Sequence, residues 1–373
     1  MKFIINRDQF LKSLTTATKI VQNKSVNPIL SNVKIELSES GLTLTGSNGE
    51  ISIVTRLPLF MNDRQIIRDV TYGSTLVNAF LLTEIVKRID GDEVSFEIID
   101  DSIAKIETEK SNFKLNSIRA DEYLDLDFSK DGAKITLPIS DFIDSINQVS
   151  FAASVKDTRP TLTAVNLESD TSKLVFTATD GARLAKKELN VQVQERLNVN
   201  IPSKTLNEIL RTITTETFIE IYISDKKVLF GLNNTLVASR LISGEYPNTK
   251  NIVPHSFYYS LEINGNELVN AMERVSLFSV EKDNVVKLTM NENKVEVSSK
   301  SQQVGSAIES ISNFRFKGER LEISFNSEYV KSAIKGLKSS DVTLSFLGEM
   351  KPFTVTDKND DSIIQLITPV RPY

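Results

Sequence analysis

Few residues in this chain belong to the types that most often carry enzymatic chemistry. The sequence has a single histidine, His255, and no cysteine. A Ser-His-Asp triad needs a histidine as its base, and zinc sites draw mainly on histidine and cysteine. His255 lies in an irregular stretch between two patterned regions, where a lone histidine is far more often structural or solvated than catalytic. Triads and His-based metal sites are therefore excluded.

Carboxylates are the remaining candidates, because the chain has 49 Asp and Glu residues. A two-carboxylate hydrolase is compatible with that composition, but no acidic pair stands out from the solvated background. The segment DEYLDLDFSKDG superficially resembles a calcium loop, yet Lys130 stands where the glycine belongs and no terminal Glu follows. The chain also has neither a Walker A sequence nor a G-x-G-x-x-G sequence. We expect no catalytic residue, no metal and no cofactor.

The hydrophobic pattern instead predicts one structural unit that is repeated along the chain. An alternating stretch at Lys134–Pro138 leads into a helical pattern whose apolar face includes Phe142 and Ile146. Three strand patterns follow, at Thr161–Glu168, Lys173–Thr179 and Ala182–Leu189. The same order begins again at the N-terminus, where the first of the three strand patterns is Ile29–Leu37, and near Tyr258, at intervals of roughly 130 residues. Such a period decides the architecture of the whole chain.

Each long period contains a second copy of the unit. Helices are predicted at Ser74–Ile89, Ser203–Ile213 and Ser327–Leu337, and three strands follow each of them. After the first of these helices the strands are expected at Glu93–Ile99, Ile103–Thr108 and Asn112–Ile118. In the first of these helices Leu76, Phe80, Ile85 and Ile89 are expected to form the apolar face. The sequence therefore predicts an α+β fold of six βαβββ units in three similar domains, 1–126, 127–253 and 254–373.

The charge distribution separates the predicted helices from the strands. The net charge of −5 argues against a generic basic nucleic-acid binder. The six helices with their flanks nevertheless hold 15 Lys and Arg against 11 Asp and Glu. Either these helix faces are simply solvated, or the helices gather on one surface that faces a polyanion. The N-terminus has no signal-peptide pattern and no segment is long enough to span a membrane, so we expect a cytoplasmic protein.

Six similar units leave the problem of exposed strand edges at both ends of the array. Two chains that meet head to tail would remove both edges by closing a ring of six domains. Two other interpretations stay open on the residues alone. One is a repeat-built enzyme that acts on an acidic polymer through carboxylates, and the other is an open solenoid scaffold that binds only proteins.

Several stretches, in this order, resemble the bacterial DNA polymerase sliding clamp, the beta subunit of the replicative DNA polymerase III holoenzyme. They are MKFIINRDQFLKSL, NPILSNVKIEL with GLTLTGSNGEISI, RPTLTAVNLE with FTATDGARLA, SGEYPNTKNIVP, and LITPVRPY at the C-terminus. The resemblance implies a head-to-tail homodimeric ring with helices inside and sheets outside. Such a ring encircles duplex DNA, confers processivity on replication without catalysis, and is opened by a clamp loader that uses ATP.

The resemblance also implies two binding sites. The family positions that contact DNA, independently of its sequence, match Lys24, Lys156, Arg159 and Lys204. Arg159 precedes a proline at the start of a strand, so a structural role suits it equally well. A cleft between domains two and three would hold short peptides of the polymerase alpha-type subunit, the clamp loader and other partners that carry a clamp-binding motif. Its matching positions are Leu162, Thr179, Gly181, Arg183, Leu184, Pro247, Ile252, Asn326, Tyr329, Met350, Leu366, Thr368, Pro369, Val370 and Arg371.

The implied dimer contact joins domain one of one chain to domain three of the other. Phe113 and Leu115 match its apolar part on domain one, and Leu277 and Phe278 match it on domain three. Taken singly, Leu162, Leu184 and Leu366 are ordinary core residues. The chain departs from family patterns at Ala182, Asn251 and Asp283, and these departures bear on the choice of partner peptide.

Overall fold

The structure is a computed structural model that describes residues 1–61, 64–193, 195–279 and 284–371. In these residues, six units of one strand, one helix and three strands follow one another. The first pair consists of β1 (Lys2–Asn6), α1 (Arg7–Thr18), β2 (Asn32–Ser38), β3 (Gly41–Ser47) and β4 (Ile51–Leu57), then β8 (Gly73–Asn78), α2 (Ala79–Arg88), β9 (Glu93–Ile99), β10 (Ile103–Glu107) and β11 (Asn112–Ile118). The predicted α+β class is confirmed.

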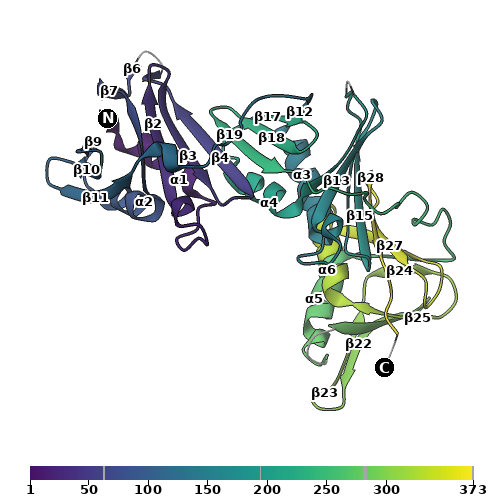
Figure 1. Cartoon of the computed structure of the whole chain (residues 1–373). Coiled ribbons are helices and arrows are strands. Elements are labelled where there is room, and N and C mark those ends of the chain that lie inside the picture. Colours follow the sequence, from purple (N-terminus) through teal and green to yellow (C-terminus); the bar gives the residue numbers. More distant parts are fainter. Residues whose placement is uncertain (62–63, 194, 280–283, 372–373) are drawn as a thin grey trace. The chain divides into compact units, whose positions relative to one another are not determined.

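The other two pairs have the same order of elements (Figure 1). The middle pair consists of β12 (Ala133–Pro138), α3 (Ile139–Val149), β13 (Ala164–Ser169), β14 (Leu174–Thr179) and β15 (Arg183–Leu189), then β16 (Leu197–Pro202), α4 (Ser203–Thr212), β17 (Phe218–Ile223), β18 (Lys227–Leu232) and β19 (Thr235–Arg240). The last pair consists of β20 (Tyr259–Asn264), α5 (Gly265–Ser276), β21 (Val285–Asn291), β22 (Lys294–Ser301) and β23 (Gly305–Ile311), then β25 (Leu321–Asn326), α6 (Ser327–Gly336), β26 (Asp341–Phe346), β27 (Phe353–Asp357) and β28 (Asp360–Ile367).

A few elements interrupt the repeat. The connection between the first two units adds β5 (Phe60–Met61), β6 (Arg64–Gln65) and β7 (Ile67–Thr71), and β24 (Phe314–Lys317) precedes the last unit. Short 3-10 helices occupy Pro28–Ser31, Ala120–Glu122, Ser150–Ala152 and Pro160–Thr163. Among the described residues no helix is both long and apolar enough to cross a membrane.

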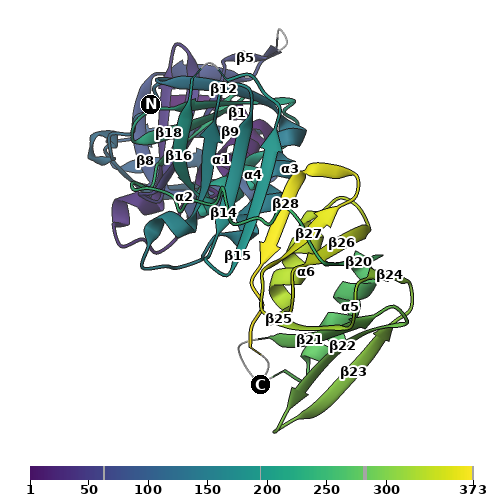
Figure 2. The ribbon, with the colours of Figure 1, turned by 90° about the vertical axis from the view of Figure 1, so that its right-hand side faces the viewer.

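The chain divides into two structural units, each with its own sheets. The first comprises residues 1–139 and 208–241, and the second comprises residues 140–207 and the described residues from 242 onward. In the first, one antiparallel sheet has the order β12-β17-β18-β19-β4-β3-β2-β8-β11-β10-β9-β1-β7, and β5 pairs only with β6 in a small separate sheet. In the second, one sheet has the order β16-β13-β14-β15-β28-β27-β26-β20-β24 and another the order β23-β22-β21-β25 (Figure 2).

Helices cover these sheets and bury one face of each. In the first unit, Phe10, Leu14 and Ala17 of α1 are buried against β3 and β4. The backbones of α1 and β3 lie close together, because a Cβ on Gly46 of β3 would be 2.1 Å from the carbonyl oxygen of Ala17. In the second unit, α5 and α6 pack on each other and on β22, β23, β27 and β28. Burial of these apolar faces is the main stabilising contribution to the fold.

An asparagine caps the N-terminus of four of the helices. The side chains of Asn6, Asn78, Asn264 and Asn326 each accept a hydrogen bond from a backbone N–H in the first turn of α1, α2, α5 and α6. Asparagine is among the preferred residues at this position, because its side chain satisfies a backbone donor that the helix leaves unpaired. The same residue therefore ends the strand and begins the helix in each of these units.

The predicted helix Ser74–Ile89 is wrong over its first part. The chain is a strand up to Asn78 and a helix only from Ala79 to Arg88. β8 is paired along its length with β2, and its buried residues lie on opposite faces of the sheet, Val77 in the main core and Leu76 in a small cluster with Leu30 and Tyr123. Sheet pairing on this stretch outweighs the helical spacing of its apolar residues. Phe80, expected in the core, is 51% exposed.

Two predicted strands begin later than expected. The patterns starting at Ile29 and Thr161 open with the 3-10 helices Pro28–Ser31 and Pro160–Thr163, and the strands begin only at Asn32 and Ala164. A proline begins each 3-10 helix, and proline suits the first position of a helix because its N–H would be unpaired there.

Candidate functional site

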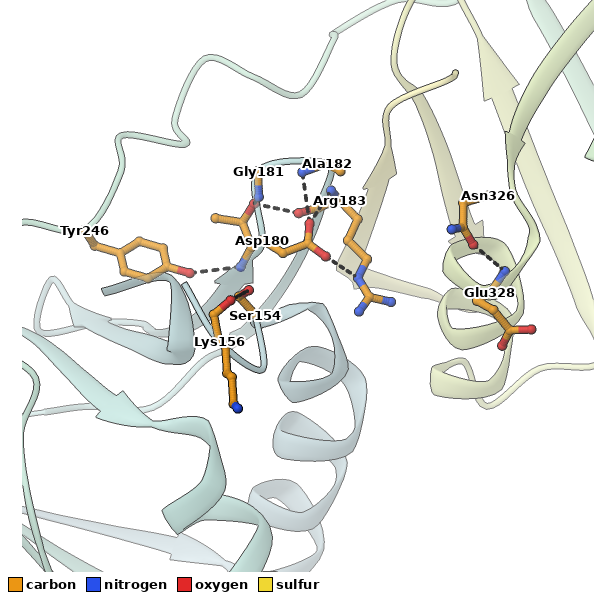
Figure 3. Close-up of polar contacts among 10 residues, drawn as sticks. Ser154, Lys156, Asp180, Gly181, Ala182, Arg183, Tyr246, Asn326 and Glu328 are labelled. Atoms are coloured by element: carbon orange, nitrogen blue, oxygen red, sulfur yellow. Dashed lines mark hydrogen bonds and ion pairs between the residues drawn. The ribbon is translucent and has the colours of Figure 1, made fainter. Parts of the chain in front are cut away.

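A tight turn between β14 and β15 forms the centre of the predicted cleft (Figure 3). The Oδ1 atom of Asp180 accepts hydrogen bonds from the N–H groups of Ala182 at 2.9 Å and Arg183 at 3.0 Å. The Thr179 hydroxyl accepts from the Gly181 N–H at 3.1 Å and donates to the Arg183 carbonyl at 2.6 Å. Gly181 has a φ of +92°, which favours glycine at this position. The turn is therefore held in one conformation by its own side chains.

Tyr246 supports this turn from a distant part of the sequence. The N–H of Thr179 donates to the Tyr246 hydroxyl at 2.9 Å. Burial, and to a smaller extent the charge of Asp180, raises the pKa of Tyr246 well above its ordinary value, and the bond from Thr179 opposes this shift. The hydroxyl is therefore neutral at neutral pH. Sequence reasoning missed Tyr246, although it lies directly before Pro247 in the stretch that carried the resemblance.

Removing this hydroxyl is expected to destabilise the second structural unit. In a Tyr246→Phe variant the N–H of Thr179 is left without its partner, and a buried N–H that loses its partner costs about 1–3 kcal/mol. The midpoint of urea unfolding, followed by circular dichroism, measures the change. Tyr258→Phe is the matched control, because Tyr258 is 76% exposed. An unchanged midpoint for Tyr246→Phe would show that the bond contributes nothing.

The side chain of Arg183 lies between two aromatic rings. Its Nε atom donates to Asp180 Oδ2 at 3.0 Å, and its guanidinium lies 4.5 Å from the ring centroid of Tyr329 and 5.5 Å from that of Phe151. A guanidinium over an aromatic face is attracted by the negative face of the ring. Burial raises the pKa of Tyr329, with a smaller contribution from Asp180 that Arg183 opposes. Phe151 was not among the predicted cleft residues.

The C-terminal segment runs across the same turn. Its strand β28 pairs with β15, placing Leu366 opposite Leu184 and Ile367 opposite Arg183. The N–H of Thr368 then donates to the Ala182 carbonyl at 2.9 Å, and the N–H of Val370 donates to the Ser324 carbonyl at 2.8 Å. The structure thereby brings the TDGAR turn and the TPVR segment together, although they are far apart in the sequence.

The remaining predicted cleft residues differ in how they are placed. Leu162, Leu184, Leu366 and Pro369 are buried and support the site from beneath. Asn326 caps α6 by accepting from the Glu328 N–H at 2.8 Å, and Tyr329 follows in the first turn of that helix. Pro247, Ile252, Met350 and Arg371 are exposed. Asn251 is exposed as well, and Asp283 lies outside the described residues.

The predicted DNA-contacting residues do not share one environment. Arg159 lies beside the cleft turn, because a Cβ on Gly181 would be 3.6 Å from its Nη2 atom. Its backbone N–H donates to Asp157 Oδ1 at 2.8 Å. Lys24, Lys156 and Lys204 are exposed, and Figure 3 shows the side chain of Lys156 directed away from the turn. Arg159 therefore lies next to the turn, and its contact with DNA stays a prediction.

The predicted dimer residues lie at two open strand edges. Phe113 on β11 is 37% exposed, and Leu115 is partly buried against the core of the first unit. Leu277 follows α5 and is 76% exposed. The ring of Phe278 lies about 3.9 Å from the position of a Cβ on Gly305, at the start of β23. None of these four side chains is fully enclosed within its own unit.

The same turn occurs a second time, between β3 and β4. Asn48 Oδ1 accepts from the N–H groups of Glu50 and Ile51, and the Ser47 hydroxyl accepts from the Gly49 N–H and donates to the Ile51 carbonyl. The position of Arg183 is taken here by Ile51, which is only 1% exposed. The repeat therefore preserves the turn but not the mostly buried cation, which occurs only in the copy between β14 and β15.

In the part of the chain that the structure describes, we find no arrangement of side chains typical of a catalytic centre. Among the described residues no group of three or more His, Cys, Asp or Glu side chains is placed to hold a metal ion. A cavity of about 750 Å³ lies on the sheet beside Tyr246. Four acidic residues line it, Glu168, Asp170, Glu188 and Glu245. Glu188 is paired with Lys173 and Lys186, and Glu168 is paired with Lys250. Carboxylates paired in this way are poor candidates for acid–base catalysis.

Comparisons with known proteins agree along the whole chain. Models of the DNA polymerase III beta subunit match in three parts, the N-terminal domain at residues 1–127, the central domain at 136–248 and the C-terminal domain at 250–371. The beta sliding clamps of Bacillus subtilis and Staphylococcus epidermidis are 36% and 35% identical, each over 100% of both chains.

Solved structures give the same result. The structure is similar to that of the DNA polymerase sliding clamp from Bacillus subtilis, with a TM-score of 0.95 at 35% identity and 100% of both chains covered. The DNA polymerase III beta chain of Streptococcus pneumoniae matches with a TM-score of 0.95 at 32% identity, again over 100% of both chains. The chain therefore has the three-domain clamp fold and belongs to the DNA polymerase III beta subunit family, the beta sliding clamps, which are non-catalytic processivity factors of DNA replication.

Proposed function

We propose that two copies of this chain close head to tail into a ring around duplex DNA in the cytoplasm, and that the ring tethers the replicative polymerase to its template. The proposal divides the chain into domains 1–126, 127–253 and 254–373. The repeated fold and the two open strand edges support a closed ring, because unpaired edges invite pairing with another chain. The clamp family to which the chain belongs supports DNA as the molecule that the ring encircles.

In this proposal the basic side chains of the helices and their flanks contact only the phosphates of the DNA. Lys24, Lys156 and Lys204 are exposed, as such contacts require. Phosphate contacts carry no sequence information, so a ring that makes only these contacts can slide along the duplex. Ring closure provides the hold on the DNA, so the individual contacts can remain weak.

The cleft around the Thr179–Arg183 turn is proposed to bind short linear peptides of the partner proteins. These are the alpha-type polymerase subunit, the clamp loader and other proteins with a clamp-binding motif. Buried Leu162, Leu184 and Leu366 provide an apolar base, while Arg183 and Arg159 provide cations at its margin. An apolar pocket with a few placed polar groups suits a peptide with leucine or phenylalanine anchors.

A topological hold on DNA is the decisive property to test. The protein is loaded with a clamp loader and ATP onto a nicked circular plasmid, and the complex is isolated at moderate salt. The plasmid is then cut once with a restriction enzyme. We expect the protein to leave the linear DNA, because a ring held by topology slides off the ends.

Two other outcomes would contradict the proposal. Retention on linear DNA, with steep loss as salt rises, would mean that the protein binds through direct contacts with phosphates. Failure to load in the presence of an active loader would favour a scaffold that binds only proteins. An uncut plasmid carried through the same steps controls for simple dissociation.

A further inference from the structure

The sheet face that forms the floor of the cleft continues into a polar floor. At the cleft, Leu184 is paired with Thr179 on one side and with Leu366 on the other. The next cross-strand row, two residues farther from the turn, is polar and consists of Asn200, Asn166, Thr177 and Lys186. Side chains two residues apart on a strand lie on the same face, about 7 Å apart. The cleft and the polar row are therefore neighbours on one surface.

The cavity of about 750 Å³ beside Tyr246 lies on this polar row. Asn166 and Thr177 line it from the sheet, and Tyr246 and Pro247 line it from the segment 244–250. Tyr246 is directed toward the cleft turn, where its hydroxyl accepts from the Thr179 N–H (Figure 3). Pro247 is one of the predicted cleft residues. The cavity and the cleft thus share one wall, and a cavity of this volume is large enough to hold a small ligand or a peptide side chain.

The segment that forms this wall is fixed to the sheet at several points. The Nδ2 atom of Asn200 donates to the Gly244 carbonyl at 2.8 Å, at the start of the segment. The bond between Thr179 and Tyr246 holds its middle, and Lys250 at its end lies 3.0 Å from Glu168. The cavity is therefore built by anchored backbone and not by the chance position of surface side chains.

The floor of the cavity contains buried polar atoms that have no partner within the protein. Thr177 is 4% exposed, and its hydroxyl makes no hydrogen bond to any described residue. Asn166 is 5% exposed and donates from Nδ2 to Asn198 Oδ1 and Asn200 Oδ1, which leaves its own Oδ1 without a donor among the described residues. Buried polar atoms nearly always have a hydrogen-bond partner. The floor therefore offers two acceptors to a ligand that carries N–H groups.

The charges around the cavity also favour a cation. Four carboxylates and three lysines line it, which leaves one negative charge in excess. Each of the three lysines already pairs with Glu188 or Glu168. Asp170 accepts hydrogen bonds within its own turn, whereas exposed Glu245 forms no ion pair with any described residue. A guanidinium carries a positive charge and five N–H donors, so it matches both the charge of Glu245 and the acceptors of the floor.

We propose that this cavity binds a basic side chain, above all arginine, of a partner peptide whose apolar anchors occupy the cleft. The inference rests on the proposed peptide-binding function and adds a second contact to it. The cation lies beside Glu245, and its N–H groups donate to the Thr177 hydroxyl and to Asn166 Oδ1. Two residues of extended peptide span the distance of about 7 Å between the two rows, so a basic residue next to the anchors reaches the cavity. Partners then differ in affinity through the residues that flank their anchors.

Fluorescence anisotropy with full-length protein tests this contact. The probes are labelled synthetic peptides of the clamp-binding segment of the alpha-type polymerase subunit, with arginine or glutamine at each of the first three positions beyond either end. At one of these positions we expect arginine to lower the dissociation constant about three- to fivefold relative to glutamine, as for a partly exposed charge pair. Glu245→Gln should abolish this difference and leave the glutamine peptide within about twofold. Glu319→Gln, an exposed glutamate between β24 and β25 and outside the cavity, is the matched control and should retain the difference.

The outcomes separate this inference from the function on which it rests. If none of the peptides binds, the proposed cleft fails together with the cavity. If the arginine and glutamine peptides bind equally at every position, the cleft stands and the role of the cavity is overturned. The chain has a net charge of −5 and attracts cations in general. A preference for arginine that persists in Glu245→Gln would therefore place the cation elsewhere and also overturn the inference.

A second measurement locates the side chain without relying on its charge. The chain contains no cysteine, so Thr249→Cys introduces a unique thiol in the wall of the cavity. A peptide with bromoacetyl-lysine at the position where arginine is preferred should alkylate this thiol, and mass spectrometry detects the adduct. Ser312→Cys is the control, because Ser312 is exposed in the same structural unit but does not line the cavity. Equal labelling of the two variants, or no labelling of Thr249→Cys by a peptide that binds, would contradict the proposed contact.

Discussion

A Leu277→Asp variant is expected to be monomeric at concentrations at which the unaltered chain is a dimer. Leu277 is 76% exposed in a single chain, so a charge there costs little before assembly. In the proposed dimer the same charge would have to leave water and enter an apolar contact without a partner. We expect the dissociation constant to rise by at least about 100-fold, which corresponds to about 2.7 kcal/mol.

Light scattering over a dilution series measures this change. Leu124→Asp is the matched control, because Leu124 is also an exposed leucine, at 40%, and belongs to no open strand edge. It is expected to dimerise like the unaltered chain. A Leu277→Asp variant that remains a dimer at low concentration would remove the end of α5 from the interface. It would then leave β11 and β23 without the apolar contact that is proposed to cover them.

An Asp360→Asn variant is expected to lose about 2–3 kcal/mol of stability, as a buried cation loses its counter-charge. The side chain of Lys187 is only 8% exposed, and its Nζ atom lies 2.7 Å from Asp360 Oδ2 and 2.6 Å from the Ser362 hydroxyl. These residues join β15 to β28, the same pair of strands that brings the turn and the C-terminal segment together. Asp360 is 26% exposed, which places the expected loss below that of a fully enclosed pair.

The loss of stability in Asp360→Asn should depend on pH, and this dependence provides a second test. Burial by itself would raise the pKa of Asp360, but hydrogen bonds from Lys187 and from the side chain and backbone of Ser362 outweigh it and lower the pKa below 3.8. A carboxyl whose pKa is lowered by folding stabilises the folded state above its unfolded pKa. That contribution disappears as the pH falls through the folded pKa. The difference between the unaltered chain and Asp360→Asn should therefore be largest near neutral pH and shrink below about pH 4.

Two further variants identify the cause of the loss. Asp361→Asn changes a neighbouring exposed aspartate and should leave the urea midpoint unchanged. Lys187→Met combined with Asp360→Asn should cost less than the two single changes added together, because the double variant leaves no unpaired charge. Additive losses would show that Lys187 and Asp360 stabilise the chain independently of each other.

The repeat and the fold class were determined by the sequence. Alternation of period two and apolar spacing of about 3.6 residues are local properties, and they recur in all six units. The predicted strands at Glu93–Ile99 and Asn112–Ile118 have the same bounds in the structure. Local pattern failed where tertiary pairing competed with it. Leu76 has helical spacing relative to Phe80, but pairing with β2 makes its segment a strand.

The candidate site was likewise predictable only where its contacts are local in the sequence. The TDGAR turn is recognisable in the sequence because Asp180 and Thr179 bond to backbone groups at most four residues away. Tyr246 and Phe151 contact that turn from remote parts of the chain, and no spacing rule predicts such contacts. Arg159 was predicted to have either a structural role or a contact with DNA, and the structure places its side chain beside Gly181. Its position depends on how β13 and β14 bring two loops together, which is not a local property of either loop.

The sequence by itself determined which elements form, their order and their repetition, because hydrogen bonds and apolar periods within a helix or strand involve near neighbours. Only the tertiary structure decided which apolar residues remain in water and which side chains meet at the turn. Phe80 and Leu14 are both apolar residues on amphipathic helices, yet one is 51% exposed and the other is fully buried. The difference arises because Leu14 lies on the buried face of α1, which packs against β3 and β4, whereas Ala79, Leu82 and Val86 form the buried face of α2 and Phe80 lies outside it.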